Sequence, residues 1–220
     1  MTPQESSNVP QATLQLNGPA PDFKAKTTHG EVQLSEWEKG KWVILFSHPA
    51  DFTPVCTTEF IAFAKLHDEL GKRNVALLGN SIDSVYSHIA WVRNIKEKFG
   101  VEIKFPIIAD LDMKVANLYG MVHAASSDTA AVRAVFFIDP KRVLRAMIYY
   151  PMNVGRNFDE VVRVIDALQT ADKHGVACPA DWRPGDKVIV PPPATTVEAE
   201  KRVANKEYEV TDWYFSKRSV

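Results

Sequence analysis

Cysteine is scarce in this chain, which has two cysteines among 220 residues. A small secreted protein held together by disulfides has many more, so the composition excludes a disulfide framework. Long apolar runs are also missing, and a membrane-spanning helix needs about 20 apolar residues in succession. Neither charge is in excess, since the formal net charge is −1. We therefore expect neither a nucleic-acid partner nor binding to an anionic membrane.

Two further signals are missing. The first seven residues contain no basic stretch followed by an apolar one, so no secretory signal is visible and a cytoplasmic location is expected. The histidines have no metal-ligand spacing with the cysteines, so we predict no metal site and no cofactor. The chain does have ample apolar content, 45% of its residues, which is enough for one full core and a small appendage.

Apolar segments with strand character alternate with segments of helical periodicity along most of the chain. Strands are expected at residues 31–34, 42–47, 75–82, 105–109, 133–139 and 144–150. Helices are expected at residues 54–71, 84–99, 114–119 and 157–171. This order predicts an α/β sandwich built around a mixed sheet.

The composition changes after Gly175. From Pro179 onward the chain is rich in proline and charge. Its last part carries four aromatic residues, Tyr208, Trp213, Tyr214 and Phe215. So short a segment does not easily build a core of its own. We therefore predict a main domain over residues 1–172 and an arm over residues 173–220 that packs on the main domain or on a partner subunit.

Cys56 lies where the strand at residues 42–47 is expected to turn into a helix. Free cysteine is often simply a buried structural thiol. However, the first turn of a helix has unpaired backbone N–H groups, and these favour the thiolate form of a cysteine placed there. The position alone is therefore compatible with a reactive nucleophile and with a structural thiol.

The neighbours of Cys56 decide between these alternatives. Pro49, Thr53 and Cys56 form the pattern Pro-x-x-x-Thr-x-x-Cys, within the segment Ser-His-Pro-Ala-Asp-Phe-Thr-Pro-Val-Cys-Thr-Thr-Glu at residues 47–59. This segment strongly resembles the peroxiredoxins, in particular their one-cysteine branch. The similarity extends from about Leu16 to the C-terminus. It implies a thioredoxin-like fold and the reduction of peroxides by the cysteine.

The resemblance implies a role for each matched residue of this segment. Cys56 would attack the distal oxygen of a peroxide and become a sulfenic acid. Thr53 would hydrogen-bond the peroxide and orient it, and Pro49 would shield the sulfur from water. His48 would contribute to the surroundings of the cysteine, although a histidine at the end of a strand can equally be satisfied by backbone groups.

A cation is needed beside the thiolate. Arg133 opens the strand at residues 133–139, where the family places its active-site arginine, although an arginine at a strand start is more often a surface residue. Glu59 matches a carboxylate of the family and would hold this guanidinium in place. Arg156 matches a second arginine near the site. The resemblance implies that both arginines help to bind the substrate.

Cys178 departs from the one-cysteine pattern. The segment around it, residues 174–185, resembles the part of two-cysteine peroxiredoxins that carries the resolving cysteine. In that class the second thiol comes from the partner subunit and condenses with the sulfenic acid to form a disulfide. We favour a resolving role for Cys178. The alternative is an incidental thiol in an enzyme that an external thiol reduces.

The predicted function is a thiol peroxidase that acts on hydrogen peroxide and small organic hydroperoxides in antioxidant defence. A thioredoxin-like protein or a small thiol would reduce it, and the chain would form at least a homodimer, with a decamer as a larger form. A disulfide oxidoreductase is disfavoured, because Cys56 has no second cysteine nearby. The non-enzymatic alternative is a peroxide sensor or holdase chaperone whose assembly responds to oxidation of Cys56.

Overall fold

The computed structural model describes residues 14–37 and 39–220. The first seven residues, in which no secretory signal is expected, lie outside the described part. The chain divides into two compact units, one ending at Arg156 and one spanning Asn157–Val220. Among the helices of the described part, none has both the length and the apolar character that crossing a membrane requires.

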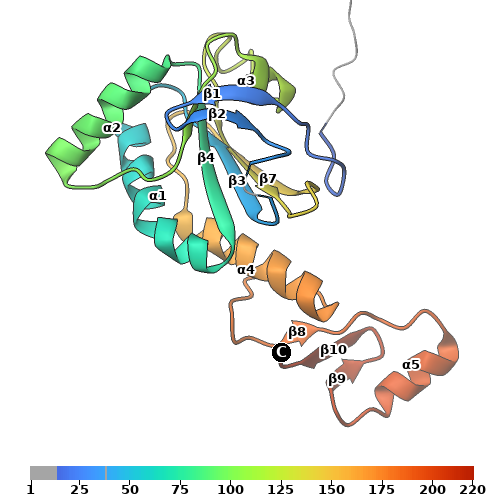
Figure 1. The fold of residues 1–220 in the computed structure, drawn as a ribbon. Helices are drawn as coiled ribbons and strands as arrows, with labels where there is room; N and C mark the ends of the chain where they lie inside the picture. The colour runs from blue at the N-terminus through green and yellow to red at the C-terminus, as the bar shows by residue number, and fades with distance from the viewer. Residues whose placement is uncertain (1–13, 38) are drawn as a thin grey trace, which may run out of the picture. The chain divides into compact units, whose positions relative to one another are not determined.

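The first unit is built on a seven-stranded sheet with the strand order β2-β1-β5-β4-β3-β6-β7 (Figure 1). Parallel pairing joins β3 to β4 and β4 to β5, whereas the other neighbours are antiparallel. The sheet is therefore mixed, as the sequence predicted. Its strands are β1 (Lys24–Thr27), β2 (Gly30–Gln33), β3 (Trp42–Ser47), β4 (Val75–Ser81), β5 (Ile107–Ala109), β6 (Arg133–Ile138) and β7 (Leu144–Tyr150).

Local sequence signals explain where the helices of this unit begin and end. α1 begins at Pro54, which suits the first helical position because the N–H of that position has no partner within the helix. α2 follows Ser84, whose hydroxyl accepts a hydrogen bond from the backbone N–H of Ser87. It ends before Gly100, which adopts a φ of 68°. The helices are α1 (Pro54–Lys72), α2 (Val85–Phe99) and α3 (Lys114–Leu118).

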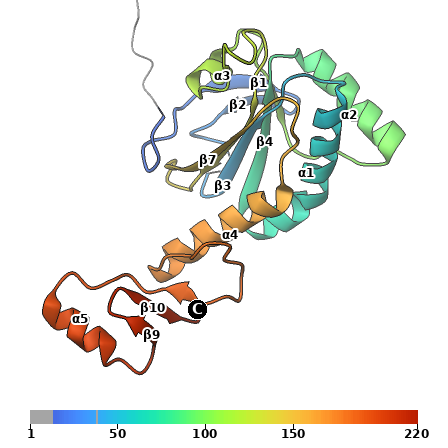
Figure 2. The same cartoon turned by 180° about the vertical axis from the view of Figure 1, so that it is seen from behind.

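Strand β3 is buried along its whole length, and its alternate side chains enter the two halves of the core. Val43 and Leu45 belong to an apolar cluster that also contains residues of α3. Phe46 points to the other half, where its ring lies 5.5 Å from Phe60 and 3.9 Å from Phe63 of α1. Figures 1 and 2 show α1 and α2 together on this side of the sheet. The active-site helix is thus anchored by aromatic contacts to the central strand.

The second unit has two helices, a small sheet and a small core of its own. The side chain of Asn157 caps the first helix by accepting hydrogen bonds from the backbone N–H groups of Asp159 and Glu160. Three strands form an antiparallel sheet in the order β8-β10-β9. Val176, Trp182 and Val188 form the buried cluster. The elements are α4 (Phe158–His174), β8 (Val188–Ile189), α5 (Thr196–Val203), β9 (Glu209–Asp212) and β10 (Phe215–Arg218).

The structure adds elements at both ends that the sequence did not predict. Strand β1 was missed because its side chains alternate lysine with small residues, so the usual apolar signal is weak. In the C-terminal region the strands have two to four residues each, too few to show a periodicity. Along the chain, the boundary between the two compact units falls between Arg156 and Asn157. The division into functional parts at residues 172 and 173 stays a prediction.

Candidate active site

Cys56 lies in the first turn of α1, after a short turn that follows β3. Its side chain is 0% exposed. Within the preceding turn Phe52 adopts a positive φ of 54°, and Thr53 is the last residue before the helix. The backbone N–H groups at the start of α1 have no partner within the helix, and they lie on the same turn as the sulfur. The fold therefore places the thiol at the positive end of a helix dipole.

Arg133, the first residue of β6, brings its guanidinium to the sulfur. Its Nη1 donates to Sγ of Cys56 across 3.2 Å and to Oε2 of Glu59 across 2.7 Å. Its Nε and Nη2 both donate to the backbone carbonyl of Met152, at 2.9 and 2.7 Å. Because the guanidinium is a permanent cation, the contact places a fixed positive charge next to the sulfur.

Glu59 lies one turn after Cys56 on α1 and is 1% exposed. Its carboxylate is shared by two arginines. Oε2 accepts hydrogen bonds of 2.7 Å from Nη1 of Arg133 and from Nη2 of Arg156. Oε1 accepts from Nε and from the backbone N–H of Arg156, at 2.9 and 3.0 Å. One buried carboxylate thus orients two cations.

Arg156 forms hydrogen bonds with several of the elements that surround the site. Its Nη1 donates to the carbonyls of Ser47 in β3 and Ala134 in β6, at 2.9 and 3.0 Å. The guanidinium lies 5.3 Å from the ring of Phe46 and 5.4 Å from the ring of Phe63. Burial lowers the pKa of Arg156 from its usual value, and the neighbouring carboxylate opposes this change. The described contacts of Arg156 therefore connect β3, β6 and, through Glu59, α1.

Thr53 presents its hydroxyl at the start of α1. The hydroxyl donates to the carbonyl of Ala50 across 2.9 Å, and it does not cap the helix. Among the described residues no donor occupies its oxygen, which can therefore accept a hydrogen bond from an O–H group. Pro49 is buried in the same turn. The turn thus brings Pro49 and Thr53 next to the helical turn of Cys56.

His48 belongs to a second buried group beside this site. Its Nε2 lies 2.9 Å from Oδ1 of Asp51, and Nδ1 of His88 lies 2.8 Å from Oδ2 of the same carboxylate. Nε2 of His88 lies 3.1 Å from the carbonyl of Ile108. The sequence predicted a role for His48 but none for Asp51 or His88. Asp51 stood inside the recognised segment, whereas nothing in the sequence linked α2 to that segment.

Burial and hydrogen bonding determine the charges in this group. Burial lowers the pKa of His48 below its usual value, and Asp51 opposes this only in part. Burial alone would raise the pKa of Asp51, but the hydrogen bonds from His48 and His88 bring it well below its usual range. Near neutral pH His48 is therefore neutral and Asp51 is ionised. The donor atoms of the three side chains lie within 4.8 Å of one another, a spacing that could also hold a metal ion. The hydrogen bonds account for the arrangement without one.

Cys178 lies in the second unit, after the end of α4. Its thiol is half-buried and donates to the carbonyl of Ala167 across 3.5 Å. Burial raises the pKa of this thiol, and Arg163 acts in the opposite direction. The resting form of Cys178 is therefore the thiol, packed at the edge of the small core of that unit.

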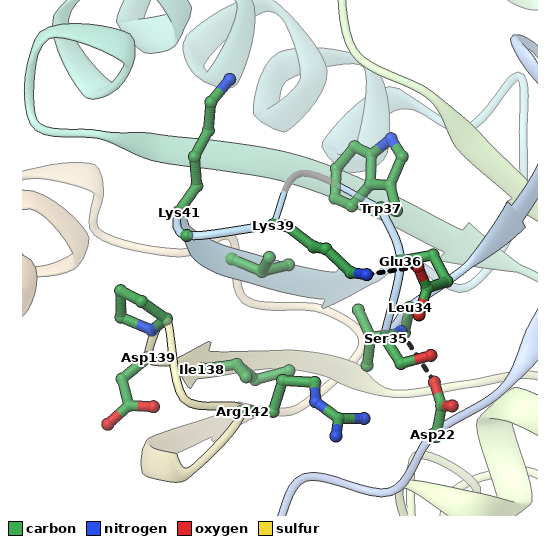
Figure 3. A pocket seen from close by; sticks show the side chains of 13 residues that line it. Asp22, Leu34, Ser35, Glu36, Trp37, Lys39, Lys41, Ile138, Asp139 and Arg142 are labelled. Atoms are coloured by element: carbon green, nitrogen blue, oxygen red, sulfur yellow. Dashed lines mark hydrogen bonds and ion pairs between the residues drawn. The ribbon is translucent and has the colours of Figure 1, made fainter.

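A surface pocket of about 620 Å³ lies at the other end of β3 (Figure 3). Val43 and Ile138, which pair across β3 and β6, are among the residues that line it. Figure 3 shows Lys39 paired with Glu36 at its edge. None of the residues predicted for the active site lines this pocket. The predicted site around Cys56 is therefore separate from this pocket.

Comparison with known proteins extends over both units. Residues 16–147 match the AhpC/TSA family, and residues 167–206 match the C-terminal domain of 1-Cys peroxiredoxin. A peroxiredoxin of Aquifex aeolicus (strain VF5) is 60% identical over 215 residues, which are 93% of this chain and 96% of that protein. The structure of the yeast mitochondrial 1-Cys peroxiredoxin, 44% identical, superposes with a TM-score of 0.83 over 94% of this chain and 100% of that one. A reduced 2-Cys peroxiredoxin of Plasmodium vivax, 35% identical, gives a TM-score of 0.73 over 79% and 92% of the two chains.

These similarities agree with the observed architecture. The seven-stranded mixed sheet with its helices is the thioredoxin-like fold expected from the sequence, and it is followed by the C-terminal arm of such proteins. The relatives do not favour the sensor or holdase alternative, because they are peroxiredoxins over nearly their whole length. This chain belongs to the peroxiredoxin family and is a thiol-dependent peroxidase.

Proposed function

We propose that Cys56 is the peroxidatic nucleophile. The observation that carries the proposal is the 3.2 Å contact between Nη1 of Arg133 and Sγ of Cys56. As a thiolate, the sulfur attacks the distal oxygen of the peroxide, so that an S–O bond forms while the O–O bond breaks. The sulfur is oxidised to a sulfenic acid, and the other oxygen takes up a proton and leaves as water or an alcohol.

Thr53 and Arg133 position the peroxide. The free lone pairs of the Thr53 hydroxyl accept the O–H of the substrate. The guanidinium of Arg133 stabilises the negative charge that develops on the departing oxygen. Pro49, buried in the same turn, keeps water from the sulfur. These contacts involve only the two oxygens of the peroxide and not the group attached to them. This supports hydrogen peroxide and small organic hydroperoxides as substrates.

Three further residues support this machinery. Glu59 and Arg156 hold the guanidinium of Arg133 at the sulfur through the shared carboxylate. Arg156 also adds positive charge to the substrate side of the site. His48 contributes a neutral imidazole to the surroundings of Cys56. The charges and hydrogen bonds described above support these proposed roles.

Peroxide consumption by two variants tests the nucleophile and its cation. We expect Cys56→Ser to lose consumption while its circular dichroism stays that of the wild type. We expect Arg133→Lys, which keeps the charge but not the planar fork, to slow the oxidation of Cys56 by roughly 100-fold. If Cys56→Ser consumed peroxide as fast as the wild type, Cys56 would not be the nucleophile.

We propose further that Cys178 resolves the oxidised enzyme. The thiol of Cys178 attacks the sulfenic acid of Cys56 in a partner subunit, an S–S bond forms, and the sulfenic oxygen leaves as water. The segment around Cys178 supports this role, since it resembles a resolving segment. The hydrogen bond to the Ala167 carbonyl must break before the thiol can react.

Mass measurement under non-reducing conditions tests this step. After one equivalent of hydrogen peroxide we expect a covalent dimer from the wild type and none from Cys178→Ser. Monomers that carry only the sulfenic acid or its overoxidised forms in both proteins would assign resolution to an external thiol. The peroxidase activity itself would not be affected by that result, because it depends on Cys56.

The remaining proposals concern partners and location. We propose a thioredoxin-like protein as reductant of the disulfide, with a small thiol as the alternative for a lone sulfenic acid. The arm at residues 173–220 serves association into a homodimer, with a decamer as a larger assembly. Two free cysteines, which a reducing compartment keeps as thiols, support the cytoplasm as the location.

A further inference from the structure

Helix α2 contacts the chain on both sides of Cys56. His88 and Trp91 are three residues apart and share the buried face of this helix. Nδ1 of His88 lies 2.8 Å from the carboxylate of Asp51, which precedes Cys56 in the sequence. Nε1 of Trp91 donates to the hydroxyl of Thr57, the residue that follows Cys56, across 3.3 Å. One helical face thus holds both the active-site turn and the first turn of α1.

The ring of His88 lies between two hydrogen-bond acceptors. The carbonyl of Ile108 can only accept, so Nε2 of His88 carries a hydrogen. Nδ1 of His88 faces both oxygens of the Asp51 carboxylate, at 3.1 and 2.8 Å. His88 is therefore held at both ring nitrogens, and one of its partners is a carboxylate whose side chain is 1% exposed. Breaking this contact leaves a buried polar group without a partner, which costs free energy.

The pair of His88 and Asp51 anchors the turn that carries Thr53. Besides its side-chain bonds, Asp51 donates its backbone N–H to Oδ2 of Asp83 across 3.0 Å. The same oxygen of Asp83 accepts from the hydroxyl of Ser81 across 2.7 Å. Thr53 then closes the turn by donating to the carbonyl of Ala50. Position 51 is thus fixed through its side chain and its main chain, two residues before the hydroxyl proposed to bind the peroxide.

The pair also fixes the tautomer of His48. The ionised Asp51 accepts a hydrogen bond from Nε2 of His48, so that nitrogen carries the hydrogen of the neutral ring. Nδ1 of His48 is then a bare acceptor, and it is buried without a hydrogen-bond partner among the described residues. His88 therefore orders both His48 and the turn of Thr53 through its contact with Asp51.

We propose that His88 is a positioning residue for the reaction of Cys56: through its contact with Asp51 it holds the turn that presents Thr53 to the peroxide. His88 lies on α2 and acts on the reacting atoms through Asp51 and the turn rather than by direct contact. It rests on the roles proposed for Cys56 and Thr53.

Two substitutions of His88 separate its two contacts. In His88→Asn the amide nitrogen takes the place of Nδ1 and keeps a donor for Asp51. In His88→Gln the amide nitrogen takes the place of Nε2, keeps a donor for the Ile108 carbonyl and loses the contact with Asp51. Both variants are made on a Cys178→Ser background, so that Cys56 is the single thiol. The measured quantity is the second-order rate constant of Cys56 oxidation by hydrogen peroxide in stopped flow.

We expect the rate constant of His88→Gln to fall roughly 10- to 100-fold, the loss that follows when a reacting group is misplaced. His88→Asn should keep most of the rate. A merely structural role would lower the unfolding midpoints of both variants without separating their rates. Equal rates in the two variants, whether both fast or both slow, would overturn the proposal. As a control, His123→Asn replaces a surface histidine and should leave the rate unchanged.

The protonation state offers a readout that does not depend on activity. In ¹⁵N spectra of histidine-labelled protein, we expect His48 to carry its hydrogen on Nε2 and to have a bare Nδ1. A hydrogen on Nδ1 of His48 would show that the pair of His88 and Asp51 does not order this ring, and it would contradict the proposal. Failure of Cys56→Ser to lose activity would instead contradict the proposed nucleophile, so the two outcomes are distinguishable.

Discussion

Glu59 accepts four hydrogen bonds from two buried arginines, Arg133 and Arg156. Removing such charges from water costs several kcal/mol per ion, and the pairing offsets this cost only while each partner is present. At the scale of single residues, the proposed reactivity of Cys56 and the stability of the core would therefore depend on the same carboxylate. A change at this position should affect both quantities.

We expect Glu59→Gln to lower the free energy of unfolding by about 3–5 kcal/mol, because two buried guanidinium groups lose their counter-charge. The rate of Cys56 oxidation should fall as well, since Arg133 is no longer held at the sulfur. Urea denaturation and stopped-flow oxidation measure the two effects.

Glu160→Gln is the matched control for this substitution. Glu160 pairs with Arg163 at the surface of α4, so its loss should cost at most about 1 kcal/mol. Equal destabilisation by the two substitutions would contradict the importance assigned to the buried pairing.

The pH dependence of stability follows from His48 and Asp51. Folding lowers the pKa of His48 from 6.5, so below that pH the unfolded chain takes up a proton that the folded protein does not. Asp51, whose pKa is also lowered by folding, adds a similar effect below 3.8. Stability should therefore fall on acidification from about pH 6.5, by up to about 1.4 kcal/mol per pH unit for one group.

Urea midpoints at pH 7, 6 and 5 check this expectation. The decrease should be smaller in His48→Asn, which lacks the titrating ring, and unchanged in the surface variant His123→Asn. A midpoint that rises between pH 7 and pH 5 in the wild type would show that His48 does not resist protonation in the fold.

At the scale of elements, the two helices next to the site begin differently. α2 starts with a true cap, since the hydroxyl of Ser84 accepts from the N–H of Ser87. The hydroxyl of Thr53 makes no such bond at the start of α1 and donates to Ala50 instead. The hydroxyl before α1 thus keeps its lone pairs for the proposed contact with the peroxide, whereas the one before α2 caps its helix.

Alanine substitutions should separate these two uses of a hydroxyl. Thr53→Ala is expected to cost no more than about 1 kcal/mol of stability but to slow Cys56 oxidation by roughly 100-fold. Ser84→Ala should cost about 1 kcal/mol through the lost cap and leave the oxidation rate within a few-fold of the wild type.

Thermal or urea unfolding and stopped-flow oxidation provide the comparison, with Thr53→Ser as the variant that restores the hydroxyl. A Thr53→Ala protein that oxidised at the wild-type rate would show that this hydroxyl does not contact the peroxide.

Long elements with strong local signals could be predicted from the sequence. α2 was expected at residues 84–99 and is observed at Val85–Phe99, because a serine cap and a terminal glycine mark its ends. β3 and β6 showed continuous apolar runs, since both are buried on both faces. The short C-terminal strands gave no such signal, because their pairing and not their composition defines them.

At the scale of the whole molecule, the site joins segments that are far apart in the sequence. The motif around Cys56 is local and could be recognised directly. Arg133 could be predicted only from the family resemblance, because its contact with the sulfur spans 77 positions of the sequence. His88 could not be found, since its contact with Asp51 spans 37 positions and no resemblance pointed to it.

The C-terminal unit presents aromatic side chains to its surroundings. Trp213 and Tyr214 lie in the turn between β9 and β10 and are 43% and 55% exposed. If this arm contributes to the proposed homodimer, replacing both by serine should raise the dimer Kd by at least roughly 30-fold, the effect of losing one aromatic hot spot. Sedimentation equilibrium measures the change.

Tyr86→Ser is the control for that measurement, because Tyr86 is 81% exposed on α2 in the other unit. Its substitution should leave the dimer Kd unchanged. An unaltered Kd in the double variant would place the dimer contact outside the β9–β10 turn.

The sharing of Glu59 has a consequence for the whole catalytic cycle. If Cys56 reacts as the proposed thiolate, then two arginines, one glutamate and this thiolate sum to zero charge. Conversion of Cys56 to a neutral sulfenic acid would leave one uncompensated positive charge in a buried space. On this proposal each turnover would convert a neutral site into a cationic one, which would attract the negative sulfur of an attacking thiolate.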